Sequence, residues 1–347
     1  MSTEDAESSN NQVTSSKGHE IFVTINFICL GGITSVFGIV TNIINMIVFY
    51  RQGFRSTTNI SFFAMSVSDL CSLVFQLVFN IYFQPLCKDI CMVVAYLDFQ
   101  ILTGGIPHAI FARITCFITV YVTAERYLCV VFPLHIKQMI TRKRTAVAMI
   151  FIYCFALLCG LPVYVINQVG LKFYPGANIS LLAIVPLQGH EVLNATEYFM
   201  HTVSGLVSFL AVVVLTSFLM ITLNKKSKWR KTANALEEKS GAISTKDRKA
   251  IMIVVLVASV LIICYTPATI LTIIMGLEPE FSMTGKYNNL YFISWSFVFL
   301  LENINASVNI FLYLKMNTKF RREFQVLFCS CIRGNQGNTA MYIKYEQ

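Results

Sequence analysis

The sequence predicts an all-α membrane protein: a bundle of seven transmembrane helices, followed by a short amphipathic helix. Two observations predict this fold class. Of the 347 residues, 55% are hydrophobic and 13% are charged, about half the charged share of a soluble domain, so the chain lacks the polar surface that a water-soluble protein of its size needs. In addition, seven stretches are long and apolar enough to cross a bilayer, which takes about 20 residues.

Each of these stretches is predicted to be a helix, because backbone groups in lipid need internal hydrogen bonds and no stretch alternates like a barrel strand. Four contain no Asp, Glu, Lys or Arg: residues 21–50, 145–171, 198–224 and 250–277. Three contain ionisable residues: 60–83 holds Asp69, 99–131 holds Arg113, Glu125 and Arg126, and 290–314 holds Glu302. The odd number of crossings puts the two ends of the chain on opposite sides of the membrane.

Lys and Arg are divided unevenly between the two sides. The first, third and fifth connections and the C-terminal tail are rich in them, whereas the opposite side holds only Lys17, Lys88, Lys172 and Lys286. Because basic residues gather on the cytoplasmic side, we expect the N-terminus outside the plasma membrane and the tail inside. The net charge of +9 is therefore an orientation signal, and no nucleic-acid partner is expected.

This topology divides the chain into three parts. Residues 1–20 form an extracellular tail, 21–328 the membrane domain with the amphipathic helix at 319–328, and 329–347 a cytoplasmic tail. Sequons at Asn178 and Asn194 lie on the long loop after the fourth helix, which the charge count places outside. Both are therefore predicted to be glycosylated.

Several polar residues fall within the predicted helices. A charge at the centre of a transmembrane helix costs about 2.5–3.5 kcal/mol, so Asp69 in the middle of the second helix needs a partner or a role. Asn42 lies in the first helix, and Asn305 and Asn309 lie on one face of the seventh because they are four residues apart. These residues are expected either to form a hydrated polar cluster or to bind neighbouring helices together.

A second group of residues is typical of a conformational switch. Glu125, Arg126 and Tyr127 end the third helix at the cytoplasmic border, and Asp247 stands before the sixth helix on the same side. A carboxylate opposite a guanidinium holds two helix ends together and releases them when they separate. Pro267 interrupts the sixth helix, where the missing N–H predicts a kink.

The motifs occur in a recognisable order. They are Gly38 with Asn42, Ser68-Asp69-Leu70, Glu125-Arg126-Tyr127, Cys264-Tyr265-Thr266-Pro267, Asn309-Ile310-Phe311-Leu312-Tyr313 and Phe320-Arg-Arg-Glu-Phe324. From residue 21 to about residue 328 their order, helices and membrane sides resemble the rhodopsin-like (class A) G-protein-coupled receptors. More narrowly, Leu102-Thr-Gly-Gly-Ile-Pro-His108, Glu278-Pro-Glu-Phe-Ser282 and Phe299-Leu-Leu-Glu-Asn-Ile-Asn305 resemble candidate chemosensory receptors of gastropod molluscs.

The resemblance implies a receptor that binds an extracellular small molecule or peptide and activates a heterotrimeric G protein through its basic inner loops. Chemosensory detection is the first expectation and a neuropeptide receptor the alternative. On activation, Arg126 would leave Glu125 and Asp247, and Asp69, Asn305, Asn309 and Tyr313 would rearrange. Cys329 and Cys331 follow the amphipathic helix and are predicted palmitoylation sites in contact with the bilayer.

Other classes fit the sequence less well. The chain has no HExxH, GxSxG or phosphate-cradling glycine loop, so no enzyme, metal or cofactor is expected. It also lacks the paired halves that are usual in transporters, and no channel signature is present.

Some residues depart from the family pattern. Ile101 stands where the family has a cysteine, and no cysteine lies between Cys159 and Cys264, so the usual disulfide of the family cannot form. Cys87 and Cys91 are both external and either form a local bridge or remain free thiols. In addition, Tyr265 replaces the usual Trp and Ile310 the usual Pro.

The resemblance places the ligand site between the outer halves of the third, fifth, sixth and seventh helices. No Lys lies between Lys286 and Lys315 to bind retinal, and His108 stands where amine receptors have Asp. Arg113 and Glu302 are expected to face each other, either clamping the carboxylate and amine of an amino-acid-like ligand or neutralising one another. The candidate ligand-contacting residues are His108, Arg113, Glu302 and the aromatic residues Tyr265, Tyr291, Trp295 and Phe299.

Overall fold

The computed structural model describes residues 18, 21–82, 95–132, 136–174, 178–186, 191–233, 245–283 and 285–328. Within these ranges the side chains of 96–97, 137–138, 174, 186, 191–201, 226–233 and 245–248 are left undescribed. Four predicted modification or bridge sites, Cys87, Cys91, Cys329 and Cys331, lie outside the described residues. The side chains of Asn194 and Asp247 do so as well.

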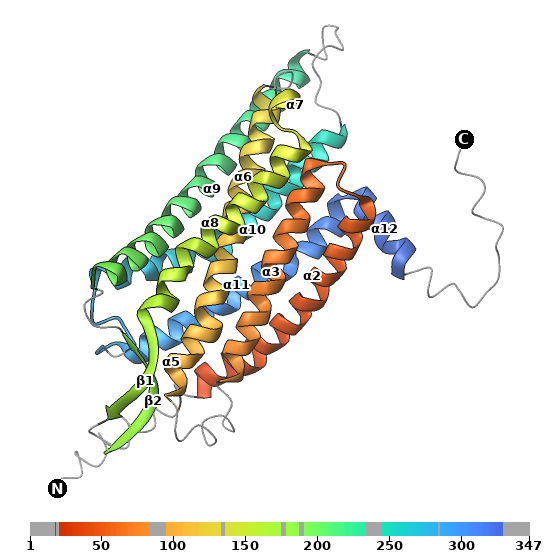
Figure 1. Ribbon diagram of the computed structural model, residues 1–347. Coiled ribbons are helices and arrows are strands. Elements are labelled where there is room, and N and C mark those ends of the chain that lie inside the picture. The colour runs from red at the N-terminus through yellow and green to blue at the C-terminus, as the bar shows by residue number, and fades with distance from the viewer. Residues whose placement is uncertain are drawn as a thin grey trace, which may run out of the picture.

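Seven helices in the described part of the chain are long and apolar enough to span a membrane, which confirms the predicted seven-helix bundle. They lie alongside one another (Figure 1). In chain order they are η1 (Ile25–Gly31) continued by α2 (Gly32–Gln52), α3 (Thr57–Ile81), α5 (Tyr96–Gln100) continued by η2 (Ile101–Gly105) and α6 (Ile106–Val131), α8 (Arg142–Ile166), α9 (Glu191–Ala233), α10 (Thr245–Leu277) and α11 (Asn288–Met316).

The two ends of the bundle carry different short elements. The helices α7 (Ile136–Met139) and α12 (Thr318–Phe328) lie at one end. The opposite end carries a hairpin of two antiparallel strands, β1 (Asn167–Tyr174) and β2 (Ile179–Pro186) (Figure 1). We call these the α12 end and the hairpin end.

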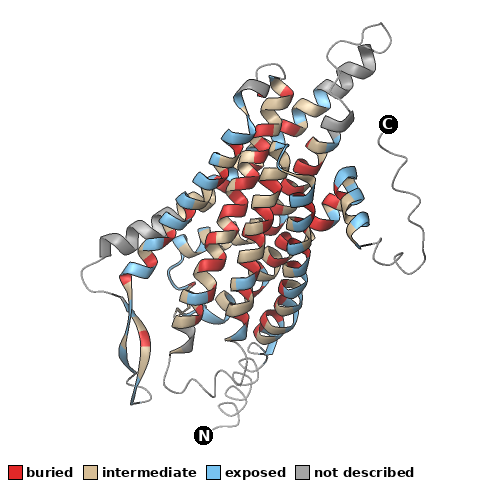
Figure 2. Cartoon of the chain, turned by 45° about the vertical axis from the view of Figure 1, so that its right-hand side comes forward, coloured by how far each residue is buried: buried red, intermediate tan, exposed pale blue. Residues whose placement is uncertain are grey.

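Apolar side chains cover the outside of the bundle and polar ones lie within it. Ile33 and Phe151, for example, are 69% and 67% exposed, whereas Asn42 and Asp69 are 0% and 2% exposed. Figure 2 shows the buried residues gathered along the inner faces of the helices. A soluble protein has the reverse arrangement, and an apolar exterior is what a lipid environment requires.

Hydrogen bonds between these buried polar groups join four helices. The amide of Asn42 on α2 donates to the carbonyl oxygen of Ala306 on α11 (2.8 Å). On α3, the Asp69 carboxylate accepts from the Thr115 hydroxyl of α6 (2.7 Å) and from the Asn309 amide of α11 (2.9 Å). Asp69 therefore has direct protein partners, which compensate for its removal from water.

The fourth helix is shorter than the sequence predicts. It ends at Ile166, whereas the uncharged stretch predicted a helix as far as residue 171. Asn167 already has an extended backbone (φ −93°, ψ 114°) and pairs with Pro186 at the base of the hairpin. The prediction was wrong there because a strand stabilised by pairing with a distant segment also needs no charge.

The hairpin is attached to the start of the third helix by its backbone. Ala95 N donates to the carbonyl oxygen of Leu182 on β2 (2.8 Å), and the neighbouring Ala183 is fully buried. These contacts hold the hairpin over its end of the bundle without the disulfide that the family resemblance would supply.

At the other end, α12 is docked by an aromatic cluster. Phe320 is fully buried, with its ring centroid 5.1 Å from Phe49 of α2 and 5.5 Å from Tyr313 of α11. The Tyr313 ring also lies 5.0 Å from Phe62 of α3. The helix α12 occupies the segment that was predicted to be an amphipathic helix. The aromatic cluster packs against the apolar face of α12 and so holds this helix in place.

Candidate ligand-binding site

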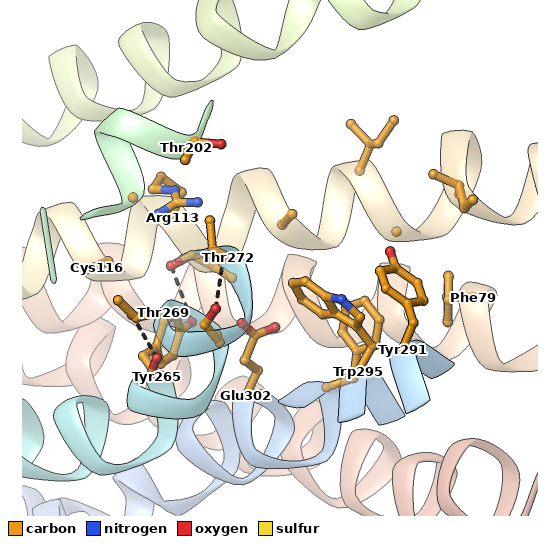
Figure 3. Close-up of a pocket in the computed structure, with 18 of the residues that line it drawn as sticks. Phe79, Arg113, Cys116, Thr202, Tyr265, Thr269, Thr272, Tyr291, Trp295 and Glu302 are labelled. Carbon is orange, nitrogen blue, oxygen red and sulfur yellow. Dashed lines mark hydrogen bonds between the residues drawn. The ribbon is translucent and has the colours of Figure 1, made fainter. Parts of the chain in front are cut away.

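A cavity of about 320 Å³ opens at the hairpin end of the bundle. This is the lower part of the range for sites that hold drug-sized ligands. Most of its lining comes from η2, α6, α9, α10 and α11, which belong to the third, fifth, sixth and seventh spanning helices, and Phe27 of η1 and Phe79 of α3 also line it (Figure 3). The lining includes Arg113, Tyr265, Tyr291, Trp295, Phe299 and Glu302, which are six of the seven residues that the sequence suggested.

One wall of the cavity is a row of aromatic rings on α11. Tyr291, Trp295 and Phe299 are spaced four residues apart, so they lie on one face of the helix. Their ring centroids are 6.1 Å apart for the first pair and 5.8 Å for the second. Phe79 of α3 also lines the cavity, and its ring centroid is 5.2 Å from that of Phe299. The row provides a rigid apolar surface along the depth of the cavity.

The predicted pair of Arg113 and Glu302 is replaced by a different pair. Glu302 Oε2 lies 2.9 Å from His108 Nε2, and His108 is 1% exposed and does not line the cavity. On its other side, His108 Nδ1 lies 3.1 Å from the carbonyl oxygen of Ser72. Residues 108 and 113 are five apart, which rotates their side chains by about 140° around a helix, so they face different neighbours.

Arg113 therefore faces the cavity without Glu302. Its guanidinium lies against Gly205 of α9, where a side chain would occupy the same space. Among the described residues it makes no hydrogen bond or ion pair, and its Nε is buried without an acceptor. Figure 3 shows Arg113 next to Thr202 of α9, on the opposite side of the cavity from the aromatic row.

The sixth spanning helix forms the floor. The Tyr265 hydroxyl donates to the carbonyl oxygen of Ala112 on α6 (3.4 Å), which connects α10 with α6 beneath the cavity. Pro267 follows two residues later inside α10 and leaves the carbonyl oxygen of Ile263 without its helical donor. The floor thus lies where α10 lacks one of its backbone hydrogen bonds.

The α12 end carries the predicted switch residues. Arg126 Nη2 donates to Glu125 Oε1 (2.7 Å) and to the Thr58 hydroxyl on α3 (2.8 Å). The Thr57 hydroxyl donates to the same Glu125 oxygen (2.6 Å). Asp247 was the expected second partner, but its side chain lies outside the described residues. The described contacts therefore connect Arg126 with the second spanning helix, a partner that the sequence did not suggest.

The remaining predicted residues have varied surroundings. The ring of Tyr127 packs 6.2 Å from Phe218 of α9, and Asn305 is buried on α11. The Tyr313 hydroxyl donates to the Met65 sulfur (3.8 Å) within the aromatic cluster. Asn178 is exposed in the turn between the two strands and has a positive φ of 53°, which Asn tolerates better than most residues.

Three features of the cavity escaped the sequence analysis. Gly205 makes room for Arg113, Thr202 lies beside it, and Phe79 supports the aromatic row. Each falls in an apolar helix where nothing in the spacing distinguishes it from ordinary packing. A glycine within a long uncharged helix was the one available signal, because it costs stability unless close packing needs it.

A comparison with known families identifies the fold. The family described as 7 transmembrane receptor (rhodopsin family) matches residues 41–313 of this chain. This range includes the spanning helices from the middle of α2 to Tyr313. The chain belongs to the rhodopsin family of seven-transmembrane receptors. It is therefore a multi-pass membrane receptor of a family that couples to G proteins and takes peptide or small-molecule ligands.

The similar proteins are receptors, and the name of one of them specifies peptide ligands. The chain is 22% identical to the tachykinin-like peptides receptor 86C of Drosophila melanogaster, over 90% of this chain and 59% of that receptor. It is 25% identical to the growth hormone secretagogue receptor type 1 of Sus scrofa, over 84% and 79%. It is 26% identical to the allatostatin-A receptor of Bombyx mori, over 86% and 78%. The chain thus spans less than two thirds of the length of the first of these relatives.

Proposed function

We propose that this chain is a neuropeptide-type G-protein-coupled receptor. In this proposal, a short peptide enters the cavity at the hairpin end, and a heterotrimeric G protein binds at the α12 end. The observation that carries the proposal is the match, over 90% of the chain, to a receptor whose name specifies peptide ligands, the tachykinin-like peptides receptor 86C.

The cavity supports this reading by its shape and lining. A volume of about 320 Å³ suits the end of a peptide better than a whole one. The remainder of a peptide would then rest on the hairpin, whose strands expose apolar side chains such as Leu171 (74%) and Phe173 (57%). The row of Tyr291, Trp295 and Phe299 would receive an aromatic or aliphatic side chain of the peptide.

The orientation follows from charge. We propose that the hairpin end faces outward from the plasma membrane, because the connections at the α12 end carry the excess of Lys and Arg. On this basis Asn178 is an extracellular glycosylation site. The basic segment 224–249 and α12 then face the G protein and the anionic inner leaflet.

The sequence resemblance first suggested a chemosensory receptor. The contacts made by residues of the resembling segments weaken this support. Two of the three segments that resemble gastropod chemosensory receptors, 102–108 and 299–305, contribute His108 and Glu302 to the buried pair. Shared residues at these places are explained by the same internal contact, whatever the ligand. None of the similar proteins named above is a chemosensory receptor.

A functional screen separates the two readings. The full chain, expressed in cultured cells with its surface level measured, is exposed to neuropeptides, free amino acids and water-borne odorants while intracellular calcium and cyclic AMP are recorded. We expect a peptide response that Phe299→Ala weakens and that the exposed Phe151→Ala leaves unchanged. Responses to odorants alone, with none to peptides, would replace the proposal with the chemosensory one.

A further inference from the structure

The charge of the cavity indicates the chemistry of its ligand, if the proposed receptor function holds. Of the described residues that line it, only Arg113 and Glu302 are formally charged. Whether the two charges are available to a ligand depends on the contacts that each already makes.

The Glu302 carboxylate is occupied. Its Oε2 lies 2.9 Å from His108 Nε2, a separation that requires a proton between them. The other ring nitrogen, Nδ1, lies 2.9 Å from the Ser72 hydroxyl and 3.1 Å from the Ser72 carbonyl oxygen. Glu302 thus already has a protein partner, which is itself held in place by Ser72.

The Arg113 guanidinium, in contrast, has no counter-ion among the described residues. Its Nε is buried without an acceptor, and its terminal nitrogens lie against the backbone of Gly205. Glycine at 205 is what leaves room for the group, so the site is shaped around the arginine. A guanidinium in an apolar membrane site is costly unless it is paired.

The opposite wall of the cavity also contains a buried donor that needs an acceptor. Trp295 Nε1, next to the aromatic row, is a buried donor without an acceptor. Among the buried side-chain atoms of the described lining, the two that lack a hydrogen-bond partner are both donors, Arg113 Nε and Trp295 Nε1. A matching ligand supplies acceptors and a negative charge.

We propose that the cavity binds a carboxylate at Arg113, with an adjacent aromatic or aliphatic group against Tyr291, Trp295 and Phe299. The ligand is then a peptide with an acidic group in the end that enters the cavity. That carboxylate is either a free C-terminus or an Asp or Glu side chain. A carboxylate is preferred to a rounder anion because the planar guanidinium offers two parallel N–H groups to its two oxygens.

The test uses small probes and the full-length receptor in lipid nanodiscs, without a G protein. The probes are N-acetyl-L-phenylalanine, its C-terminal amide, and N-acetyl-L-glutamyl-L-phenylalaninamide, whose carboxylate is on a side chain. Binding is measured from the rise in thermal unfolding temperature against probe concentration. The variants are Arg113→Met, which keeps an unbranched apolar stem but removes the guanidinium and its charge, Arg113→Lys, and the exposed cytoplasmic Arg55→Met as the matched control.

We expect at least one carboxylate probe to bind the wild type and Arg55→Met about tenfold more tightly than the amide does. Arg113→Met abolishes this preference, and Arg113→Lys retains part of it. The probe that shows the preference distinguishes a C-terminal from a side-chain carboxylate. Equal binding of all three probes, no binding of any, or a preference that survives Arg113→Met would overturn the proposal. Because no G protein is involved, failure here is distinct from failure of the signalling function.

Discussion

Replacing Thr58 by valine tests whether the contact of Arg126 with the second spanning helix holds the receptor in a resting state. The Thr58 hydroxyl accepts a hydrogen bond of 2.8 Å from Arg126 Nη2, and Thr58 and Arg126 lie on different helices, α3 and α6. Valine has nearly the same shape and removes only the hydroxyl. If Arg126 turns away from α3 to meet a G protein, this bond stabilises the resting form alone.

The expected magnitude follows from the contacts that remain. A hydrogen bond to a charged group contributes about 1.5–3 kcal/mol. Arg126 keeps its bond to Glu125 at 2.7 Å in the variant, so we take the lower figure, about 1.5 kcal/mol. Each 1.4 kcal/mol is a factor of ten in an equilibrium. For a wild-type receptor that is active only a small fraction of the time, Thr58→Val would therefore raise the basal activity about tenfold.

The assay is nucleotide exchange on a heterotrimeric G protein by the purified receptor without ligand. Thr318→Val serves as the matched control, because Thr318 is exposed at the start of α12 on the same end of the bundle. We expect basal exchange to rise in Thr58→Val and to stay at the wild-type level in Thr318→Val. Unchanged basal exchange in a well-folded Thr58→Val protein would refute the role of this contact.

Three further predictions concern stability and the hairpin. Glu302→Leu leaves the buried His108 without its partner and is expected to cost about 3–5 kcal/mol, seen as a lower unfolding temperature, whereas His108→Phe combined with Glu302→Leu recovers most of it; equal stability of the single and double variants would contradict the pair. A Cβ at Gly104 would lie 2.7–2.8 Å from atoms of Phe79 that include its backbone. Gly104→Ala is therefore expected to lose about 1–3 kcal/mol of stability, seen as a lower unfolding temperature. Gly105→Ala serves as the control and is expected to lose little, because its Cβ would meet only the edge of the Phe79 ring at 3.4 Å. Because the hairpin is attached through Ala95 and Leu182, ligand binding is expected to resist mild reductants; its loss on reduction would show that a disulfide outside the described residues supports the site.

The spanning helices could be predicted from the sequence because lipid imposes one requirement on every residue that it surrounds. Seven long apolar runs met that requirement, four of them without any charge, and they became seven helices. The end of the fourth helix could not be predicted in this way. Residues 167–171 are as free of charge as the helix before them, and their strand depends on pairing with β2, a segment more than ten residues away.

The site could be predicted by its elements and residue types but not by its pairings. Tyr291, Trp295 and Phe299 were expected in the wall, and their spacing of four places them there. The partner of Glu302 was not foreseen, because both His108 and Arg113 lie on the facing helix, little more than one turn apart. Which of them meets Glu302 depends on how α6 is rotated about its axis, and this rotation is set by packing against α3 and α9.

The most direct test of the whole account is ligand-dependent nucleotide exchange by the purified receptor and a heterotrimeric G protein in nanodiscs. The account predicts that a peptide with an acidic group accelerates exchange on the G protein and that Arg113→Met reduces its potency. Binding of such a peptide without any acceleration of exchange, or an ion current that appears without a G protein, would contradict it.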